Sequence, residues 1–337
     1  MRVTFDTLST FAIATLMAGL SATAFVRTDA GDPLKGWTNG AYQRGFEGRF
    51  EASIPANEGA VAIWAAVKWI LFQEPADGAV AGKDGWLFTA EEFTEPSDPR
   101  DFSSELARVS RALSKDGITL VPLIVPDKAR MQAQRLQRGR SESFTQRYAH
   151  TLAAIQNAGL VGIDLRKTLQ IDAAFMRTDT HWSPEGARRA ANAIAEAVQE
   201  LEIPRAKVTT LATGVTEFDG DLMSFVATGP FRSRVGPARE TIENFETTVA
   251  TKGGLFGDVA VPVALVGTSF SAKEEFHFEG FLKQALQADV LNLSHVGQGP
   301  FVPMDAFLKD RSSFSTLPLL VIWEIPERFL TSRSTQK

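Results

Sequence analysis

Two short segments that lie far apart in the sequence carry side chains suited to acyl transfer. The first is the turn 267–271, where an apolar run ends at a glycine and presents Ser269 just before a helical pattern. A serine placed there exposes its hydroxyl and lies near helix-terminal backbone N–H groups that can stabilise an oxyanion. Ser269 is therefore a candidate nucleophile; the alternative is a plain helix cap.

The second segment, 177–184, contains an Asp-x-His pair just before another helical pattern. On an extended backbone Asp179 and His181 point to the same side, so the carboxylate can accept the Nδ1–H bond and leave Nε2 free as a base. A capping or packing role is the alternative for His181, and His295, in a loop after a predicted strand, is the rival base. Together with Ser269 the pair would supply a nucleophile, a base and an orienting carboxylate.

Three more residues are candidates for contact with the substrate or the oxyanion: Asn292, Gln298 and Trp182. The sequence gives poor support for a metal site, because it has no cysteine and no two histidines three or four residues apart on a helix. A phosphate loop is also missing, since the segment 297–300 is too short and lacks the lysine. We therefore expect chemistry that needs neither a metal nor an organic cofactor.

Helical and strand patterns alternate from Ser103 onward. We expect helices over 104–115, 144–158, 184–201, 272–286 and 303–309, and strands over 118–125, 161–165, 263–267, 289–293 and 319–323. This alternation predicts an α/β fold with a mostly parallel sheet and helices on both faces. The strands are continuous apolar runs, as expected for a sheet buried on both sides. Ligands of such sheets bind beyond the carboxyl ends of the strands, where Ser269 lies.

The other segments fall outside this alternation. Residues 203–258 have no long helical period and are interpreted as a β-rich insertion or cap. Residues 28–80 are interpreted as an N-terminal arm followed by an amphipathic helix, and 81–330 as the main domain. Residues 1–27 contain an uncharged apolar run and are interpreted as an export signal, either cleaved as a signal peptide or retained as a membrane anchor; a buried helix is the alternative.

The composition is that of an ordinary globular protein. The 337 residues are 44% hydrophobic and 22% charged, which allows one large domain or two modest ones. The formal net charge is −5, so the chain has no overall positive field to attract phosphates. Nucleic acid is therefore not an expected partner.

Four motifs together resemble the alginate O-acetyltransferase family of the AlgJ and AlgX type. They are the segments 82–88, 179–186, 267–271 and 321–328. The resemblance covers about residues 60–330. It implies an SGNH-hydrolase-like domain with permuted element order, in which the Asp-x-His pair precedes the serine. It also carries the catalytic roles of the family onto Asp179, His181 and Ser269.

The resemblance further implies an O-acetyltransferase that acetylates hydroxyls of an exported exopolysaccharide, alginate-like or cellulose, through an acetyl-serine intermediate. Family members act in the periplasm, so we expect this chain there, soluble or anchored to the inner membrane. The expected partners are the polysaccharide acceptor, an inner-membrane export complex, and an acetyl donor relayed by a membrane acyltransferase. Two alternatives stay open: a carbohydrate acetylesterase with the same triad, and a non-catalytic polymer-binding subunit of an export complex.

Overall fold

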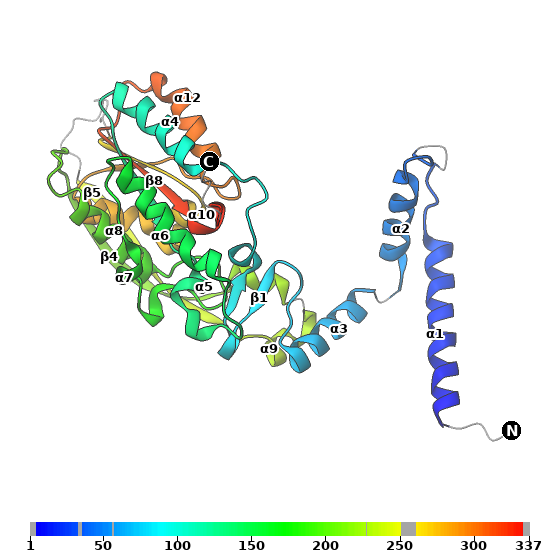
Figure 1. Cartoon of the computed structure of the whole chain (residues 1–337). Coiled ribbons are helices and arrows are strands. Elements are labelled where there is room, and N and C mark those ends of the chain that lie inside the picture. The colour runs from blue at the N-terminus through cyan, green and yellow to red at the C-terminus, as the bar shows by residue number, and fades with distance from the viewer. Residues whose placement is uncertain (1–4, 33–35, 56, 227, 251–260, 333–337) are drawn as a thin grey trace. The chain divides into compact units, whose positions relative to one another are not determined.

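The chain forms two compact units (Figure 1). The computed structural model describes residues 5–32, 36–55, 57–226, 228–250 and 261–332. The smaller unit comprises the described residues up to Gln73 together with those of 226–236, and the larger comprises those of 74–225 and 237–337. The candidate triad and the predicted strands all belong to the larger unit.

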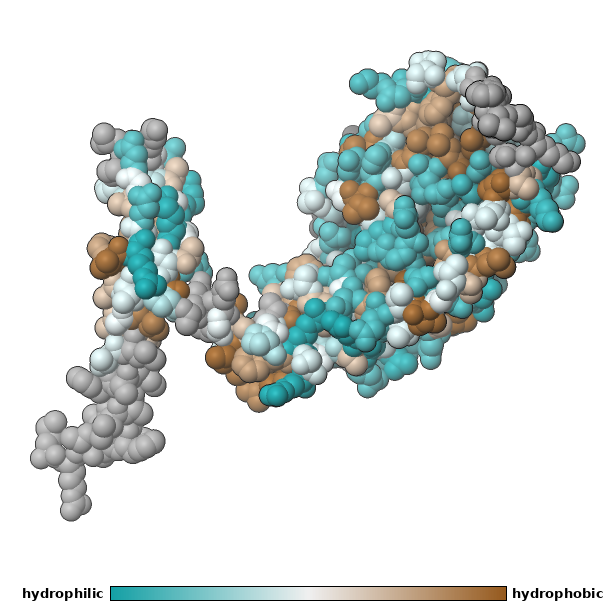
Figure 2. Space-filling model, turned by 180° about the vertical axis from the view of Figure 1, so that it is seen from behind, coloured by the Kyte–Doolittle hydropathy of each residue, from teal (hydrophilic) through white to brown (hydrophobic). Residues whose placement is uncertain are grey.

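The smaller unit is helical. Its helices are α1 (Phe5–Arg27), α2 (Ala41–Ser53), α3 (Asn57–Phe72) and the short α9 (Arg232–Val235). Among the residues described, no helix combines the length and apolar character needed to cross a membrane. Helix α3 buries Ala62, Ala66 and Trp69 and exposes Trp64 and Phe72, and brown hydrophobic residues gather over this segment in Figure 2. The predicted helix is therefore present, but the residues that it exposes include large apolar side chains, so the expected polar side is not seen.

The larger unit is built on one parallel sheet. Its strands are β3 (Thr119–Val125), β6 (Val263–Val266), β7 (Val290–Asn292) and β8 (Leu320–Pro326). They lie in the order β3-β8-β6-β7, and all three pairings are parallel. The predicted α/β class is confirmed. Ser269 follows β6, one of the two central strands, at its carboxyl end.

Alternate residues of β3, β6 and β8 enter two separate hydrophobic cores. On β8, Leu320 and Ile322 belong to one core, whereas Val321, Trp323 and Ile325 belong to the other. This is the period of two expected for side chains on opposite faces of a strand. Because both faces are covered, the strands read as unbroken apolar runs in the sequence.

Helices cover the two faces. One core includes side chains of α4 (Phe102–Lys115), α6 (Glu142–Asn157) and α12 (Phe301–Asp310). The other includes α8 (Pro184–Ala197) and α11 (Phe278–Leu286), which pack on each other. The buried residues of α8 are small: Ala187, Ala190 and Ala191 at helical spacing, followed by Ile194.

The predicted strand 161–165 is wrong. Residues 161–164 form no strand, and Leu165 starts the short helix α7 (Leu165–Thr168), which Asp164 caps. The hydroxyl of buried Tyr148 explains the difference. It accepts the Leu165 N–H at 3.0 Å, and its single proton can go to the carbonyl oxygen of Ile124 on β3 at 3.2 Å or to that of Ile163 at 3.4 Å. A side chain therefore satisfies backbone groups that a neighbouring strand would otherwise have paired.

The remaining strands form two antiparallel pairs outside the sheet. Strand β1 (Ala79–Ala81) pairs with β2 (Leu87–Thr89), and β4 (Lys207–Phe218) pairs with β5 (Glu240–Ala250). The long β4–β5 hairpin confirms the β-rich insertion; the last part of the predicted range, 251–258, lies outside the described residues. The insertion therefore adds a two-stranded ribbon that is separate from the parallel sheet and contacts α11.

Candidate active site

Ser269, His181 and Asp179 form one chain of hydrogen bonds. The Ser269 hydroxyl lies 2.7 Å from His181 Nε2, and His181 Nδ1 lies 2.6 Å from Asp179 Oδ1. With the ring proton on Nδ1, the imidazole donates to Asp179 and can accept the serine proton at Nε2. The separation is well within the roughly 3.5 Å that a nucleophile and its base require. Such a chain can carry a proton off the serine hydroxyl.

The turn that carries Ser269 is fixed to a buried carboxylate. Glu324, on β8, is fully buried and accepts the Thr268 N–H at 2.7 Å; it also accepts the hydroxyls of Thr268 and Ser271 at 3.0 and 3.1 Å. Burial raises the pKa of Glu324 to about 7, although these hydrogen bonds act in the opposite direction. Gly267 completes the turn, since a Cβ there would lie 2.5 Å from Glu324 Oε2.

The helix predicted over 272–286 is broken, and the break shapes the site. Helix α10 (Ser269–Ala272) ends after one turn, and α11 begins at Phe278, after His277 adopts a left-handed conformation with φ of 55°. The intervening Phe276 is fully buried and stacks on the His181 ring at 5.2 Å between centroids. The break thus places an aromatic ring against the imidazole.

A buried lysine holds the backbone of the Asp-x-His segment through hydrogen bonds. Lys128, in the short helix α5 (Lys128–Met131), is 1% exposed and donates to the carbonyl oxygens of Asp179 at 2.8 Å and Arg177 at 2.9 Å, as well as to Leu87 O. Burial lowers the pKa of Lys128 to about 8. At the other end of the segment, Ser183 caps α8 by accepting the Gly186 N–H. Both anchors hold the backbone on either side of His181.

Asp179 is held as a carboxylate. Its Oδ1 accepts the backbone N–H of His181 at 2.9 Å as well as the ring Nδ1–H, and Oδ2 accepts the Asp221 N–H at 2.8 Å. Burial alone would raise the pKa of Asp179, but the hydrogen bond and charge of His181 and the nearby Lys273 ammonium outweigh it and keep that pKa well below its usual range. The carboxylate can therefore orient the imidazole and stabilise its cation.

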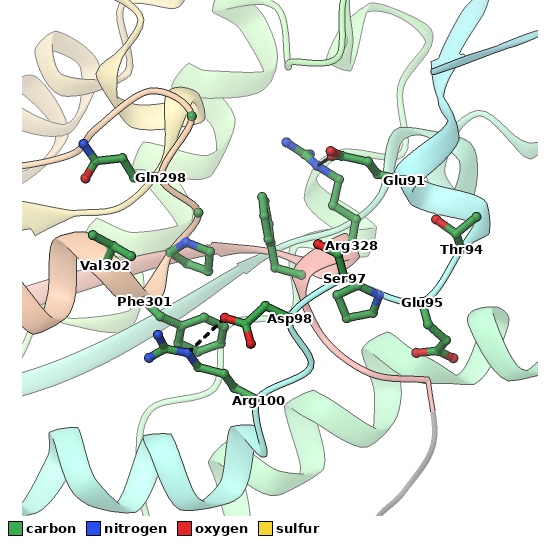
Figure 3. A pocket seen from close by; sticks show the side chains of 15 residues that line it. Glu91, Thr94, Glu95, Ser97, Asp98, Arg100, Gln298, Phe301, Val302 and Arg328 are labelled. Carbon is green, nitrogen blue, oxygen red and sulfur yellow. Dashed lines mark hydrogen bonds and ion pairs between the residues drawn. The ribbon is translucent and has the colours of Figure 1, made fainter. Parts of the chain in front are cut away.

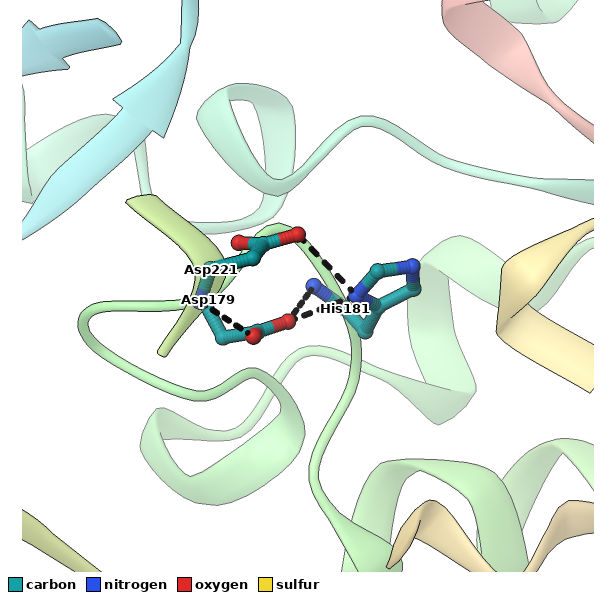
Figure 4. Close-up of side chains that lie close together, drawn as sticks. All are labelled: Asp179, His181 and Asp221. Carbon is teal, nitrogen blue, oxygen red and sulfur yellow. Dashed lines mark hydrogen bonds and ion pairs between the residues drawn. The ribbon is translucent and has the colours of Figure 1, made fainter. Parts of the chain in front are cut away.

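A second carboxylate, absent from the sequence prediction, faces the same imidazole. Asp221 Oδ2 lies 3.6 Å from His181 Nδ1, and Figure 4 shows the two carboxylates beside the ring. The ligand atoms of Asp179, His181 and Asp221 lie within 4.8 Å of one another, a spacing that could hold a metal ion. However, both His181 ring nitrogens are engaged, one with Asp179 and one with Ser269. We read the arrangement as a proton-transfer site.

Among the residues that the structure describes, no hydrogen bond joins the three additional candidates to the serine hydroxyl. Trp182 is fully buried, in contact with the rings of Phe270 and Phe278, so its indole is not accessible to a substrate. Asn292 donates its amide N–H groups to Ser271 O at 2.8 Å and to a carboxylate oxygen of Glu279 at 3.2 Å. It therefore supports the helix that carries the nucleophile.

Gln298 lines a cavity of about 440 Å³ (Figure 3). Arg328 lies on the opposite side of the cavity and donates to Glu91 at 2.9 Å. Its guanidinium carbon lies 5.4 Å from the ring centroid of Phe270, the residue after the nucleophile, and 5.1 Å from that of Phe329. Gln298 is thus placed in a cavity whose wall touches the neighbour of Ser269, and no hydrogen bond joins it to the triad in the described part of the chain.

Comparisons with known proteins identify the family of this chain. The family model described as the SGNH hydrolase-like domain of acetyltransferase AlgX matches residues 79–327. A probable alginate O-acetylase AlgJ of Pseudomonas aeruginosa is 36% identical over 318 residues, covering 88% of this chain and 81% of the relative. The alginate biosynthesis protein AlgX of the same species is 28% identical, over 74% of this chain and 56% of its own length.

One solved structure extends the likeness to the fold. The O-acetyltransferase domain of Pseudomonas putida AlgJ superposes with a TM-score of 0.65 at 32% identity, covering 78% of this chain and 95% of that domain. The matched region includes the parallel sheet, the Asp-x-His segment and the serine turn. The chain therefore belongs to the AlgJ/AlgX family of alginate O-acetyltransferases, which is defined by an SGNH hydrolase-like domain.

Proposed function

We propose that this protein transfers acetyl groups to hydroxyls of an exported exopolysaccharide, alginate-like or cellulose, through an acetyl-serine intermediate on Ser269. The observation that carries the proposal is the hydrogen-bonded chain Asp179–His181–Ser269, with distances of 2.6 and 2.7 Å. Membership of an alginate-acetylating family supports the choice of a polysaccharide acceptor. The apolar segment within 1–27 supports action in the periplasm after export.

In the first step Ser269 takes the acetyl group from its donor. His181 Nε2 accepts the hydroxyl proton while Oγ attacks the acetyl carbonyl carbon, and the resulting imidazolium is stabilised by the Asp179 carboxylate. The tetrahedral intermediate then breaks its bond to the donor, whose leaving group takes the proton from His181. The products are acetyl-Ser269 and the deacetylated donor. A membrane acyltransferase that relays acetyl groups is the proposed source of that donor.

In the second step the polysaccharide hydroxyl takes the place of the donor. His181 Nε2 removes its proton, the oxygen attacks the acetyl-serine carbonyl, and Ser269 leaves with the proton returned to Oγ. Transfer exceeds hydrolysis only if water is kept from the acyl-enzyme while the sugar is bound. The same triad with water as acceptor would make an acetylesterase, so the acceptor must be tested directly.

We assign the Ser269 backbone N–H as the first oxyanion donor. The neighbouring N–H groups are committed elsewhere: Thr268 N donates to Glu324, and Ser271 N and Ala272 N both donate to Thr268 O. An N–H on the nucleophile itself stays close to the developing oxyanion in both steps. No metal or organic cofactor takes part in either step of this proposal.

The test follows the acetyl group. With a chromogenic acetyl ester as donor, the wild-type protein should release the leaving group, gain one acetyl group by intact-mass measurement, and acetylate alginate, mannuronan or cellulose oligomers. Ser269→Ala and His181→Ala should abolish all three events. Asp179→Ala should slow them by about 10³-fold or more, because members of a triad act as a unit. Ser143→Ala, an exposed serine on α6, is the matched control.

Each contrary outcome has a definite meaning. Ester turnover that survives Ser269→Ala would remove this serine as the nucleophile. Release of acetate by the wild type without labelling of any oligomer would favour the esterase. Complete inertness toward acetyl esters would favour a polymer-binding subunit of an export complex.

A further inference from the structure

The segment that follows strand β4 makes several contacts with the Asp-x-His pair. The backbone N–H of Asp221 donates to Asp179 Oδ2 at 2.8 Å. In return Asp221 Oδ1 accepts the Thr180 N–H at 2.8 Å and the Thr180 hydroxyl at 3.1 Å. The Leu222 N–H donates to Thr178 O at 3.2 Å. Every residue from 178 to 180 is thus hydrogen-bonded to this segment.

A glycine makes this close approach possible. A Cβ on Gly220 would lie 2.1 Å from Thr178 O and 2.6 Å from Asp179 N, closer than side-chain atoms come to backbone. Only glycine lets the two backbones pack this tightly at that point. The contact is therefore built into the sequence of the β-rich insertion and is not an accident of a loose surface loop.

The free oxygen of Asp221 faces the catalytic imidazole. Oδ2 lies 3.6 Å from His181 Nδ1, while Asp179 Oδ1 holds the same nitrogen at 2.6 Å. The other charged groups near Asp221 are the Lys273 ammonium, 3.9 Å from Asp179 Oδ2, and buried Lys128. Burial and the Asp179 carboxylate raise the pKa of Asp221, whereas the charges of His181 and Lys273 act in the opposite direction.

We propose that Asp221 is a positioning residue of the active site, which fixes the Asp179–His181 pair and adds a second carboxylate that stabilises the His181 imidazolium. The inference rests on the proposed function for its effect on turnover. An anion within about 4–6 Å favours the charged form of its neighbour. Since the imidazolium exists only while the proton is on His181, the interaction is strongest during acyl transfer. The β-rich insertion thereby takes part in catalysis.

Two substitutions separate the two contributions. Asp221→Asn keeps an oxygen that can accept from Thr180 but removes the charge, whereas Asp221→Ala removes both. Thr180→Val is the matched control, because it deletes only the hydroxyl bond at 3.1 Å. Asp221→Asn should lower kcat/KM about 10-fold and move the acidic midpoint of its pH profile down by about one pH unit. This shift is at the low end of the range for a neighbouring charge, because the Asp221 side chain is partly exposed. Asp221→Ala should lose more activity, and Thr180→Val should keep the wild-type midpoint.

The experiment is a pH–rate profile with a chromogenic acetyl ester, paired with NMR titration of the histidine rings. The His181→Ala spectrum assigns the His181 signal among the chain's four histidines. A downward move of that ring's midpoint in Asp221→Asn supports the proposal even if turnover is too slow to follow. An unchanged midpoint in a folded Asp221→Asn protein by both measurements overturns it. Wild-type inertness toward esters would instead refute the proposed function and leave the NMR comparison as the test of Asp221.

Discussion

Glu324 gives the stability of this protein a pH dependence that can be calculated from the structure. Its carboxyl group is fully buried beneath the nucleophile turn, and burial raises its pKa from 4.5 to about 7. In the unfolded chain the group ionises at the lower value. Between these two values the folded protein holds a proton that the unfolded chain has lost, so stability falls as the pH rises.

The size of the effect follows from the two pKa values. The full difference corresponds to about 3 kcal/mol, and most of it, about 2–3 kcal/mol, falls between pH 5 and pH 8. Glu324→Gln removes the ionisation while preserving the shape. The amide oxygen can take the place of Oε2 and accept the Thr268 N–H and the Ser271 hydroxyl, and the amide NH2, in the place of Oε1, can donate to the Thr268 hydroxyl. The variant should therefore lose this contribution to the pH dependence.

The assay is urea unfolding at pH 5 and pH 8 for both proteins, followed by near-ultraviolet circular dichroism. The quantity of interest is the change in free energy of unfolding between the two pH values, compared between variant and wild type. Glu324→Gln should gain about 2–3 kcal/mol relative to wild type on going from pH 5 to pH 8. Other buried carboxyls titrate in both proteins and cancel in this difference. The exposed substitution Glu200→Gln is the control. An equal pH dependence in wild type and Glu324→Gln would refute the reasoning.

Three further substitutions test the packing around the site. Gly220→Ala should destabilise the fold by about 1–3 kcal/mol and reduce ester turnover, because the added methyl group would clash with Thr178 O. Gly139→Ala is the control and should have neither effect, because the space around its Cβ is open. Equal denaturation midpoints for the two variants would contradict this prediction. Tyr148→Phe should cost about 1–3 kcal/mol in urea unfolding, since Leu165 N loses its buried acceptor. Lys128→Met should cost about 3 kcal/mol or more and abolish turnover, because the hydrogen bonds of the buried ammonium to three backbone carbonyl groups are lost. Activity at the wild-type level would show that the Asp-x-His segment does not need this lysine.

Local pattern was enough to predict the sheet and the triad. Buried parallel strands read as apolar runs, and helices read through their 3.6-residue period, so four of the five predicted sheet strands are present. The Asp-x-His spacing and the serine after a strand are also local signals, because they describe positions relative to a single element. The fold then brings the two segments to one place, since ligand sites of such sheets lie beyond the carboxyl ends of the strands.

The residues that surround the triad could not be predicted from local pattern, because their roles depend on contacts between distant segments. Glu324 carried one signal, a charged residue inside an apolar strand, but only its pairing beside β6 reveals that it holds the serine turn. Gly220 and Asp221 lie within the segment that is interpreted from its sequence only as a β-rich insertion. Nothing in their own segment shows that they pack against residues 178–180, because that contact joins two chain positions about forty residues apart.

The two errors in secondary structure have the same origin. Residues 161–165 have the composition of a strand, but the Tyr148 hydroxyl takes the place of a neighbouring strand. Residues 272–286 have the period of one helix, but it breaks at His277, where the ring bonds to Thr247 on the hairpin at 2.7 Å and buried Phe276 reaches the imidazole of the triad. The sequence by itself determined which residues could do the chemistry and which runs would be buried. Tertiary structure decided which carboxylates, rings and backbone groups support them, because those partners are chosen by proximity in space and leave no periodic trace along the chain.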